Sequence, residues 1–155
     1  MKYASIVPLI GGQTMGMEKV WGGSPEFFLS FPGFQDHDQH ARAYYPNTPY
    51  HIVEDNVPLD TKFTGVDVLS TTCPCAGLSS LSSTASSESA TNDWMLHSAE
   101  VALGQVKPRV FWGENAPYLA TKMGEPTVKK LKAIGAKHGY AFSLYQTLST
   151  LHGLP

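Results

Sequence analysis

Two motifs in the sequence have residue types and positions that suit nucleophilic chemistry. Cys75 follows a predicted strand over residues 66–70, and Glu114 with Asn115 follows another over residues 109–112. Because parallel strands bring their carboxyl ends to one edge of a sheet, we expect both motifs to meet there. A thiolate at that edge could attack a substrate while the carboxyl group donates a proton. A cysteine without such an acid would more often be inert packing.

A second group of residues could hold a nucleotide-like cofactor. Gly11, Gly12 and Gly16 surround the start of a predicted helix, where glycines let the backbone approach a ligand. Asp36 and Asp38 follow the second predicted strand, where α/β cofactor folds commonly place an acid on ribose hydroxyls. Each feature also has a structural interpretation, because glycines are common in strand-to-helix turns and aspartate is a common helix N-cap.

Metal binding is the weaker interpretation of the histidines and cysteines. His37 and His40 are spaced to share one helical face, but no other motif completes a zinc or iron site. Cys73 and Cys75 lack the second half of a zinc site, so we expect no metal. Cysteines this close also make a poor structural disulfide, which favours a reducing, intracellular setting. A redox function of the two thiols is an alternative.

The elements that must position these residues alternate between short apolar runs and helical patterns, which predicts a parallel sheet with crossover helices. The predicted strands are residues 3–9, 26–31, 50–53, 66–70, 109–112 and 140–145. The predicted helices begin near Gly11 and cover residues 39–45, 93–105 and 127–138. Residues 79–92 are dense in Ser, Thr and Ala and bury little surface, so we expect a mobile loop there.

Composition limits the class of protein. The chain has 155 residues, of which 42% are hydrophobic and 11% aromatic, enough for one packed domain. With 11 Lys+Arg against 13 Asp+Glu the net charge is −2, which excludes a protein that coats nucleic acid by charge alone. A local nucleic-acid site remains open. No apolar run approaches the roughly 20 residues that span a bilayer.

Taken together, these motifs resemble the DNA (cytosine-5) methyltransferase family. TTCPCAGLS is similar to the family's Pro-Cys nucleophile loop, and KPRVFWGENAPYL to its Glu-Asn-Val strand end. IGGQTMGMEK resembles the first family motif, EDN at 54–56 its Gly-Asp-Ile turn, and ARAYYPNTP its Tyr-x-x-Asn-x-Pro run. The resemblance spans nearly the whole chain in the family's motif order. It implies an α/β, Rossmann-like fold of the S-adenosylmethionine-dependent methyltransferases, with a mostly parallel sheet.

The resemblance also implies a reaction, the methylation of cytosine C5 in DNA with S-adenosylmethionine as methyl donor. Cys75 would add to C6 of a cytosine flipped out of the duplex, Glu114 would protonate or hydrogen-bond N3, and Asn115 would hold that carboxyl group. The residues that the resemblance assigns to the cofactor are Gly11, Gly12, Gly16, Asp36 or Asp38, Asp55, Asn56 and Met95. Met95 is equally well explained as a core residue.

The sequence departs from the family pattern at two places that matter for the cofactor. The stretch SIVPL at residues 5–9 stands where the family has Asp-Leu-Phe-x-Gly, which removes an aromatic contact to adenine and one turn glycine. The usual Glu of the second motif falls near Gln35, so Asp36 and Asp38 are substitute candidates. Some phage-borne members look similar at these places, and we interpret the changes as divergence.

Family members continue beyond the last residue of this sequence with a Gln-x-Arg-x-Arg motif, a target-recognition domain and two final motifs. We therefore expect residues 1–155 to be the catalytic and cofactor-binding portion, incomplete at the C-terminus and without a target-recognition domain. The expected partners are double-stranded DNA and a second chain that supplies the missing parts. The alternative is a non-catalytic, methyltransferase-like binding partner or subunit. The expected location is the cytoplasm of a bacterium or a phage-infected host cell, without membrane attachment.

Overall fold

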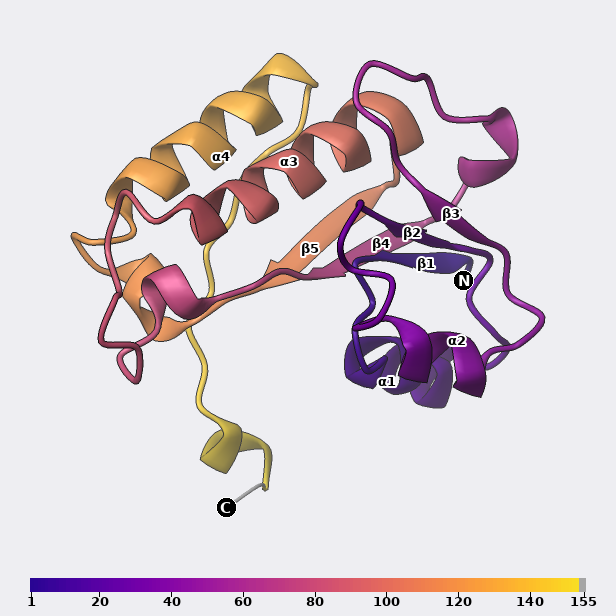
Figure 1. Cartoon of the computed structure of the whole chain (residues 1–155), viewed down its shortest axis with the longest axis horizontal. Helices are drawn as coiled ribbons and strands as arrows, with labels where there is room; N and C mark the ends of the chain where they lie inside the picture. The colour runs from indigo at the N-terminus through magenta and orange to yellow at the C-terminus, as the bar shows by residue number, and fades with distance from the viewer. Residues whose placement is uncertain (154–155) are drawn as a thin grey trace.

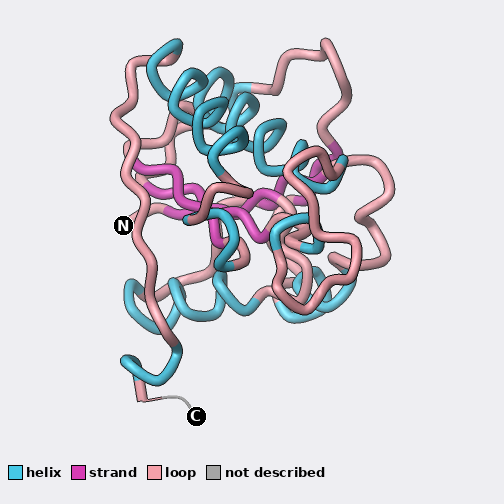
Figure 2. The backbone as a smooth tube through the Cα atoms, turned by 90° about the vertical axis from the view of Figure 1, so that its left-hand side faces the viewer, coloured by secondary structure: helices cyan, strands magenta, loops and turns pink. Residues whose placement is uncertain are grey.

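A parallel sheet of five strands lies between two layers of helices in the computed structural model, which describes residues 1–153 (Figure 1). The strand order is β3-β2-β1-β4-β5, and Figure 2 shows helices on both sides of the strands. The strands are β1 (Tyr3–Ile6), β2 (Phe28–Ser30), β3 (Tyr50–Ile52), β4 (Val68–Thr72) and β5 (Val110–Glu114). The helices are α1 (Gly12–Trp21), α2 (Gln39–Tyr44), α3 (Asp93–Val101) and α4 (Glu125–Lys137). This arrangement confirms the predicted α/β, Rossmann-like fold.

Single helical turns occupy several of the connections. A π-helical turn, η4, extends α3 over Ala102–Val106. The 3-10 turns are η1 (Thr61–Phe63), η2 (Ala76–Leu78), η3 (Ala90–Asn92), η5 (Pro117–Ala120) and η6 (Ser149–His152). Across residues 1–153, no helix has the length and apolar character that crossing a membrane requires.

Strands β1 and β2 are buried throughout, and β4 nearly so, because helices cover the sheet there, whereas the edge strand β5 is largely exposed. In the first strands, Ile6, Phe28 and Leu29 are completely buried. One face of the sheet carries α1 and α2, and the other carries α3 and α4 (Figure 1). Packing of these side chains fixes the strands in place. The loops that follow the carboxyl ends of the strands can therefore hold functional residues.

The order of the strands reverses between β1 and β4, which are paired in register from Tyr3 with Val68 to Ile6 with Thr71. Three buried hydroxyl groups join the elements at this point. Ser5 Oγ lies 2.8 Å from Thr14 Oγ1 of α1 and 2.8 Å from Ser70 Oγ of β4. In open α/β sheets ligands bind outside the carboxyl ends of the strands at such a reversal, so this edge is where a site is expected.

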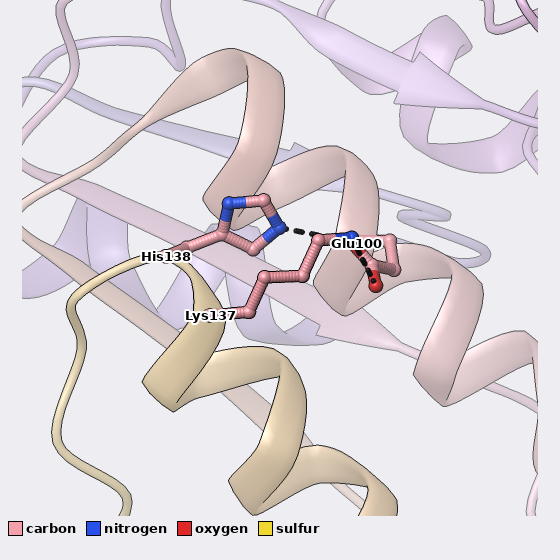
Figure 3. Close-up of polar contacts among 3 residues, drawn as sticks. All are labelled: Glu100, Lys137 and His138. Atoms are coloured by element: carbon pink, nitrogen blue, oxygen red, sulfur yellow. Dashed lines mark hydrogen bonds and ion pairs between the residues drawn. The ribbon is translucent and has the colours of Figure 1, made fainter.

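The helices α3 and α4 are joined at their C-terminal ends by a cluster of charged side chains (Figure 3). His138 Nε2 lies 2.9 Å from Glu100 Oε2, and Lys137 Nζ donates to both Glu100 oxygens at 3.1 Å. Helices that connect parallel strands run antiparallel to them, so this cluster lies at the end opposite to the carboxyl edge of the sheet.

The prediction of a sixth strand over residues 140–145 is wrong, because residues 140–148 form no regular secondary structure. Tyr140 N instead donates to Gly135 O of α4, and Tyr140 Oη donates to Pro108 O at 2.7 Å. These contacts fix the segment across the end of α4, and its backbone does not pair with β5. Residues 79–89 form turns without a helix or strand, whereas residues 90–92, the end of the loop predicted over 79–92, form η3.

Candidate active site

The two motifs that carry the predicted chemistry follow neighbouring strands. Thr72, the last residue of β4, is paired with Glu114, the last residue of β5. Cys75 comes three residues after Thr72 along the chain, and Asn115 directly follows Glu114. Both Cys75 and Glu114 are exposed. The ladder between β4 and β5 therefore brings the loop that contains Cys75 to the same edge of the sheet as Glu114.

The two cysteines of the chain differ in their surroundings, and both are free thiols. Cys73 is only 2% exposed, and its Sγ lies 3.0 Å from Thr71 Oγ1 and 3.3 Å from Ser98 Oγ. Burial raises the pKa of the Cys73 thiol, and the negative charge of Glu114 raises it further. Cys73 is therefore held as a neutral, structural thiol. Cys75 is the exposed cysteine, and η2 begins directly after it.

Asn115 is held in place by two contacts of its amide group. Its Oδ1 accepts a hydrogen bond of 2.8 Å from Ala116 N, and its Nδ2 lies 3.9 Å from Met95 Sδ. Met95 is 4% exposed, and its Cε would lie 3.2 Å from a Cβ added to Gly113. The structure thus brings Met95 and Asn115 together, and Met95 packs below β5 as a core residue.

The turn after β1 depends on Gly11 and not on all three of the predicted glycines. Gly11 has φ +87°, and an added Cβ would lie 3.3 Å from Ala41 Cβ of α2. Gly12 is the exposed first residue of α1. Gly16 lies one turn further along the helix, where an added Cβ would meet open space. Next to these residues, the buried Oε1 of Gln13 has no hydrogen-bond partner among the described residues.

Two residues of the same turn adopt left-handed backbone conformations that the sequence does not signal. Val7 has φ +53° and Leu9 has φ +51°, a region that side chains with a Cβ rarely adopt. Leu9 stands where the sequence resemblance implies a turn glycine, and its backbone adopts a conformation that favours glycine. Strain of this kind is concentrated at functional sites.

Asp38 does not lie where a cofactor could reach it, and this part of the sequence prediction needs correction. The residue is completely buried at the start of α2. Its carboxylate accepts hydrogen bonds from Leu9 N at 2.8 Å, from Tyr50 Oη at 2.9 Å and from Ser30 Oγ. Burial raises the pKa of Asp38, although these hydrogen bonds act in the opposite direction. Asp36 is exposed and remains the candidate for a ribose contact.

The turn after β3 is connected to α3 by an ion pair. Asp55 Oδ1 lies 3.5 Å from His97 Nε2, and Asn56 has φ +63°. His97 packs against the buried Phe31, with ring centroids 4.4 Å apart, and Trp94 lies next to both. This aromatic group is a feature that the sequence analysis missed. The only signal for it in the sequence is that Phe31 follows β2 and that Trp94 and His97 share one side of α3.

A surface hollow next to this edge is formed by residues 87–89 and the first turns of α3 and α4. Its lining includes Asn92, Leu96 and Lys130, while Cys75 and Glu114 lie outside it. Across residues 1–153, no group of three or more His, Cys, Asp or Glu side chains could hold a metal ion.

Comparison with known proteins gives one match that covers nearly all of the chain. Residues 1–152 match the family model of the C-5 cytosine-specific DNA methylases. No curated protein matches the chain.

Proposed function

The chain belongs to the C-5 cytosine-specific DNA methylase family, and from this premise we propose that it methylates cytosine in DNA through a covalent adduct of Cys75, with S-adenosylmethionine as methyl donor. We assign the catalytic and cofactor-binding functions to residues 1–155. The observation that carries the proposal is the pairing of Thr72 with Glu114, which sets the exposed Cys75 loop beside the acid.

In the proposed reaction, the thiolate of Cys75 adds to C6 of a cytosine that has left the duplex, and a C6–S bond forms. The electron pair of the C5–C6 double bond moves toward C5, and Glu114 delivers a proton to N3 so that negative charge does not remain on the ring. Asn115 holds the loop of Glu114 through its contacts with Ala116 and Met95. After C5 is methylated, the C5 proton passes to solvent, the C6–S bond breaks with return of its electron pair to Cys75, and the N3 proton returns to Glu114, which restores the aromatic ring.

S-adenosylmethionine, when bound, supplies the electrophilic methyl group. Its proposed ligands are Gly11 and Gly12 at the start of α1, Asp36 for the ribose, and Asp55 with Asn56 near the adenine. The unpartnered Oε1 of Gln13 fits this assignment, because a buried acceptor next to the glycine turn calls for a donor. We place Met95 behind these ligands, as a packing residue of α3, and leave Gly16 as an exposed residue of α1 outside the proposed contacts.

Trapping with DNA that contains 5-fluorocytosine tests the proposal, because fluorine at C5 blocks the final elimination. With the methyl donor present, we expect the wild-type chain and the Cys73→Ser variant to form a covalent adduct that survives denaturation. The Cys75→Ser variant should form none. Absence of adduct from the wild type when a complementing C-terminal half is supplied, or equal loss in both variants, would contradict the assignment of Cys75.

Charge suggests that this chain does not hold the duplex alone. Its net charge is −2, whereas tight binding of the phosphate backbone needs a basic surface. We therefore propose that a second chain contributes the surface that grips double-stranded DNA. The expected dissociation constant for residues 1–155 alone is in the range of about 10⁻⁶ to 10⁻⁴ M at physiological salt. Nanomolar, sequence-specific binding in a titration would overturn this part.

A non-catalytic binding function is the second candidate, and exposed apolar side chains favour it. Tyr145, Leu148 and Leu151 are 81%, 62% and 72% exposed, and Trp112 on the edge strand β5 is 41% exposed. Surfaces of this kind are typical of protein contacts. The same trapping experiment separates the two functions, because a purely structural subunit would form no adduct even when its partner is supplied.

A further inference from the structure

The serine-rich segment that follows the Cys75 loop folds back onto it at Gly77. Gly77 N donates a hydrogen bond of 3.0 Å to Thr91 Oγ1, and Gly77 O accepts one of 2.9 Å from Ser86 N. Both backbone polar groups of a residue that lies two positions after Cys75 are therefore bound by the far end of this segment. In Figure 1 the start of α3 lies beside the turn that follows β4.

The approach at Gly77 is too close for any side chain. A Cβ added there would collide with Asn92 Oδ1 and would lie 2.7 Å from Ser89 Cβ and from Thr91 Oγ1. Gly77 is buried although Cys75 is exposed. The glycine is required here because backbone and side chains meet directly.

Asn92 completes this contact from the other side. The residue is 3% exposed, and its Nδ2 donates to Ser86 O at 3.0 Å. Its Oδ1 faces Gly77 and has no hydrogen-bond partner among the described residues. Buried polar atoms are almost always paired, so this unpaired oxygen requires an explanation.

The N-terminal end of α3 also contacts the loop that follows Glu114. The helix begins directly after Asn92, and Met95 in its first turn contacts Asn115 and packs against Gly113. One short stretch of chain thus touches the nucleophile loop through Gly77 and the Glu114 loop through Asn115. We propose, given the catalytic functions assigned above to Cys75 and Glu114, that Thr91 and Asn92 are positioning residues that hold Cys75 at a fixed place relative to Glu114.

The test compares Thr91→Val, which keeps the shape but removes the acceptor oxygen, with Thr91→Ser, which keeps the oxygen. At saturating DNA and methyl donor, Thr91→Val should slow adduct formation by about 10- to 100-fold, because small misplacements of a reacting group have effects of this size. Thr91→Ser should form the adduct at the wild-type rate. Affinity for S-adenosylmethionine should be unchanged in both variants, and the thermal midpoint should fall in Thr91→Val alone, because that variant loses the hydrogen bond to Gly77 N.

Hydrogen exchange of the Gly77 amide gives a measurement that does not depend on activity. We expect exchange to be about tenfold faster in Thr91→Val than in Thr91→Ser, because local opening loses a hydrogen bond. Equal exchange in the two variants would overturn the contact itself, and faster exchange with an unchanged adduct rate would overturn its positioning function. If the wild type forms no adduct, the proposed function fails, and the exchange measurement still decides whether Thr91 holds the loop.

Discussion

The backbone N–H of Leu9 donates a hydrogen bond of 2.8 Å to Asp38 Oδ1, and this bond joins the turn after β1 to the start of α2. Leu9 has a left-handed backbone, with φ +51°. A residue with a Cβ keeps such a conformation only when its surroundings enforce it. Here the buried carboxylate of Asp38 stabilises this conformation, and it is itself fixed by hydrogen bonds from Ser30 and Tyr50. Asp38 therefore stabilises the backbone of the turn after β1.

The Asp38→Asn variant tests this relationship. It replaces an oxygen that accepts hydrogen bonds with an amide nitrogen, so we expect a loss of about 1–3 kcal/mol in the free energy of unfolding. Affinity for S-adenosylmethionine should fall as well, because the turn at Leu9 loosens. Denaturant titration and calorimetry measure the two effects. The matched control is Asp36→Asn, which should weaken cofactor binding without changing stability.

The pH dependence of the Asp38→Asn effect follows from the raised pKa of Asp38. The folded chain then binds a proton that the unfolded chain has released, so wild-type stability falls as pH rises from the ordinary aspartate pKa through the raised value. The destabilisation of the variant relative to wild type should be largest below that window and smaller above it. A pH-independent difference would show that Asp38 titrates alike in both states.

Glu114→Gln should slow adduct formation by about 10²-fold or more, the usual size of positioned acid catalysis. The amide cannot deliver a proton to N3, while its size and hydrogen-bonding groups are retained. Single-turnover trapping on fluorinated DNA measures the rate. Glu26→Gln makes the same chemical change at the exposed amino end of β2 and should leave the rate unaltered. A wild-type rate in Glu114→Gln would remove the acid from the mechanism.

The two thiols should differ strongly in reactivity. An alkylating reagent at neutral pH is expected to modify Cys75, which is exposed, and to leave Cys73 intact. The thiolate is the reactive form, and burial raises the pKa of Cys73. Peptide mass mapping gives both rates in one experiment, and unfolding in denaturant should make them equal. Comparable rates in the folded chain would favour a function in which the cysteines act as a pair.

The Glu100 cluster between α3 and α4 should contribute a small, pH-dependent stability. Its hydrogen bond from His138 and the charge of Lys137 lower the pKa of Glu100. A lowered pKa gives stability that is present above the ordinary glutamate value and is lost as pH falls through the lowered one. Glu100→Gln should therefore cost less than about 1 kcal/mol near neutral pH, because solvent screens this partly exposed group. Urea titrations should show no difference once the wild-type glutamate is protonated.

Much of the fold could be predicted because local patterns determine it. Apolar runs marked the five observed strands, and the parallel topology then required the ends of β4 and β5 to meet, which brings Thr72 next to Glu114. The boundaries differed by a few residues, since strand ends depend on the pairing of neighbours. The predicted sixth strand failed for a related reason: an apolar run becomes a strand only where a partner accepts its hydrogen bonds, and Tyr140 bonds to Gly135 and Pro108 instead.

The sequence could not predict contacts that leave no repeating pattern of residue types. The burial of Asp38 depends on Ser30 and Tyr50, which lie on different strands. The meeting of Gly77 with Thr91 joins two ends of a low-complexity segment whose composition predicts only a loop. Such contacts arise from the packed chain as a whole, and both concern how the candidate site is held.

The hydroxyl groups of Ser5, Thr14 and Ser70 give the reversal point of the sheet a distinctive property. They carry no charge at any pH at which the protein is folded, so neither acidification nor added salt alters the bonds between them. The contact between β1, α1 and β4 should accordingly keep its spacing when the pH or the salt concentration changes.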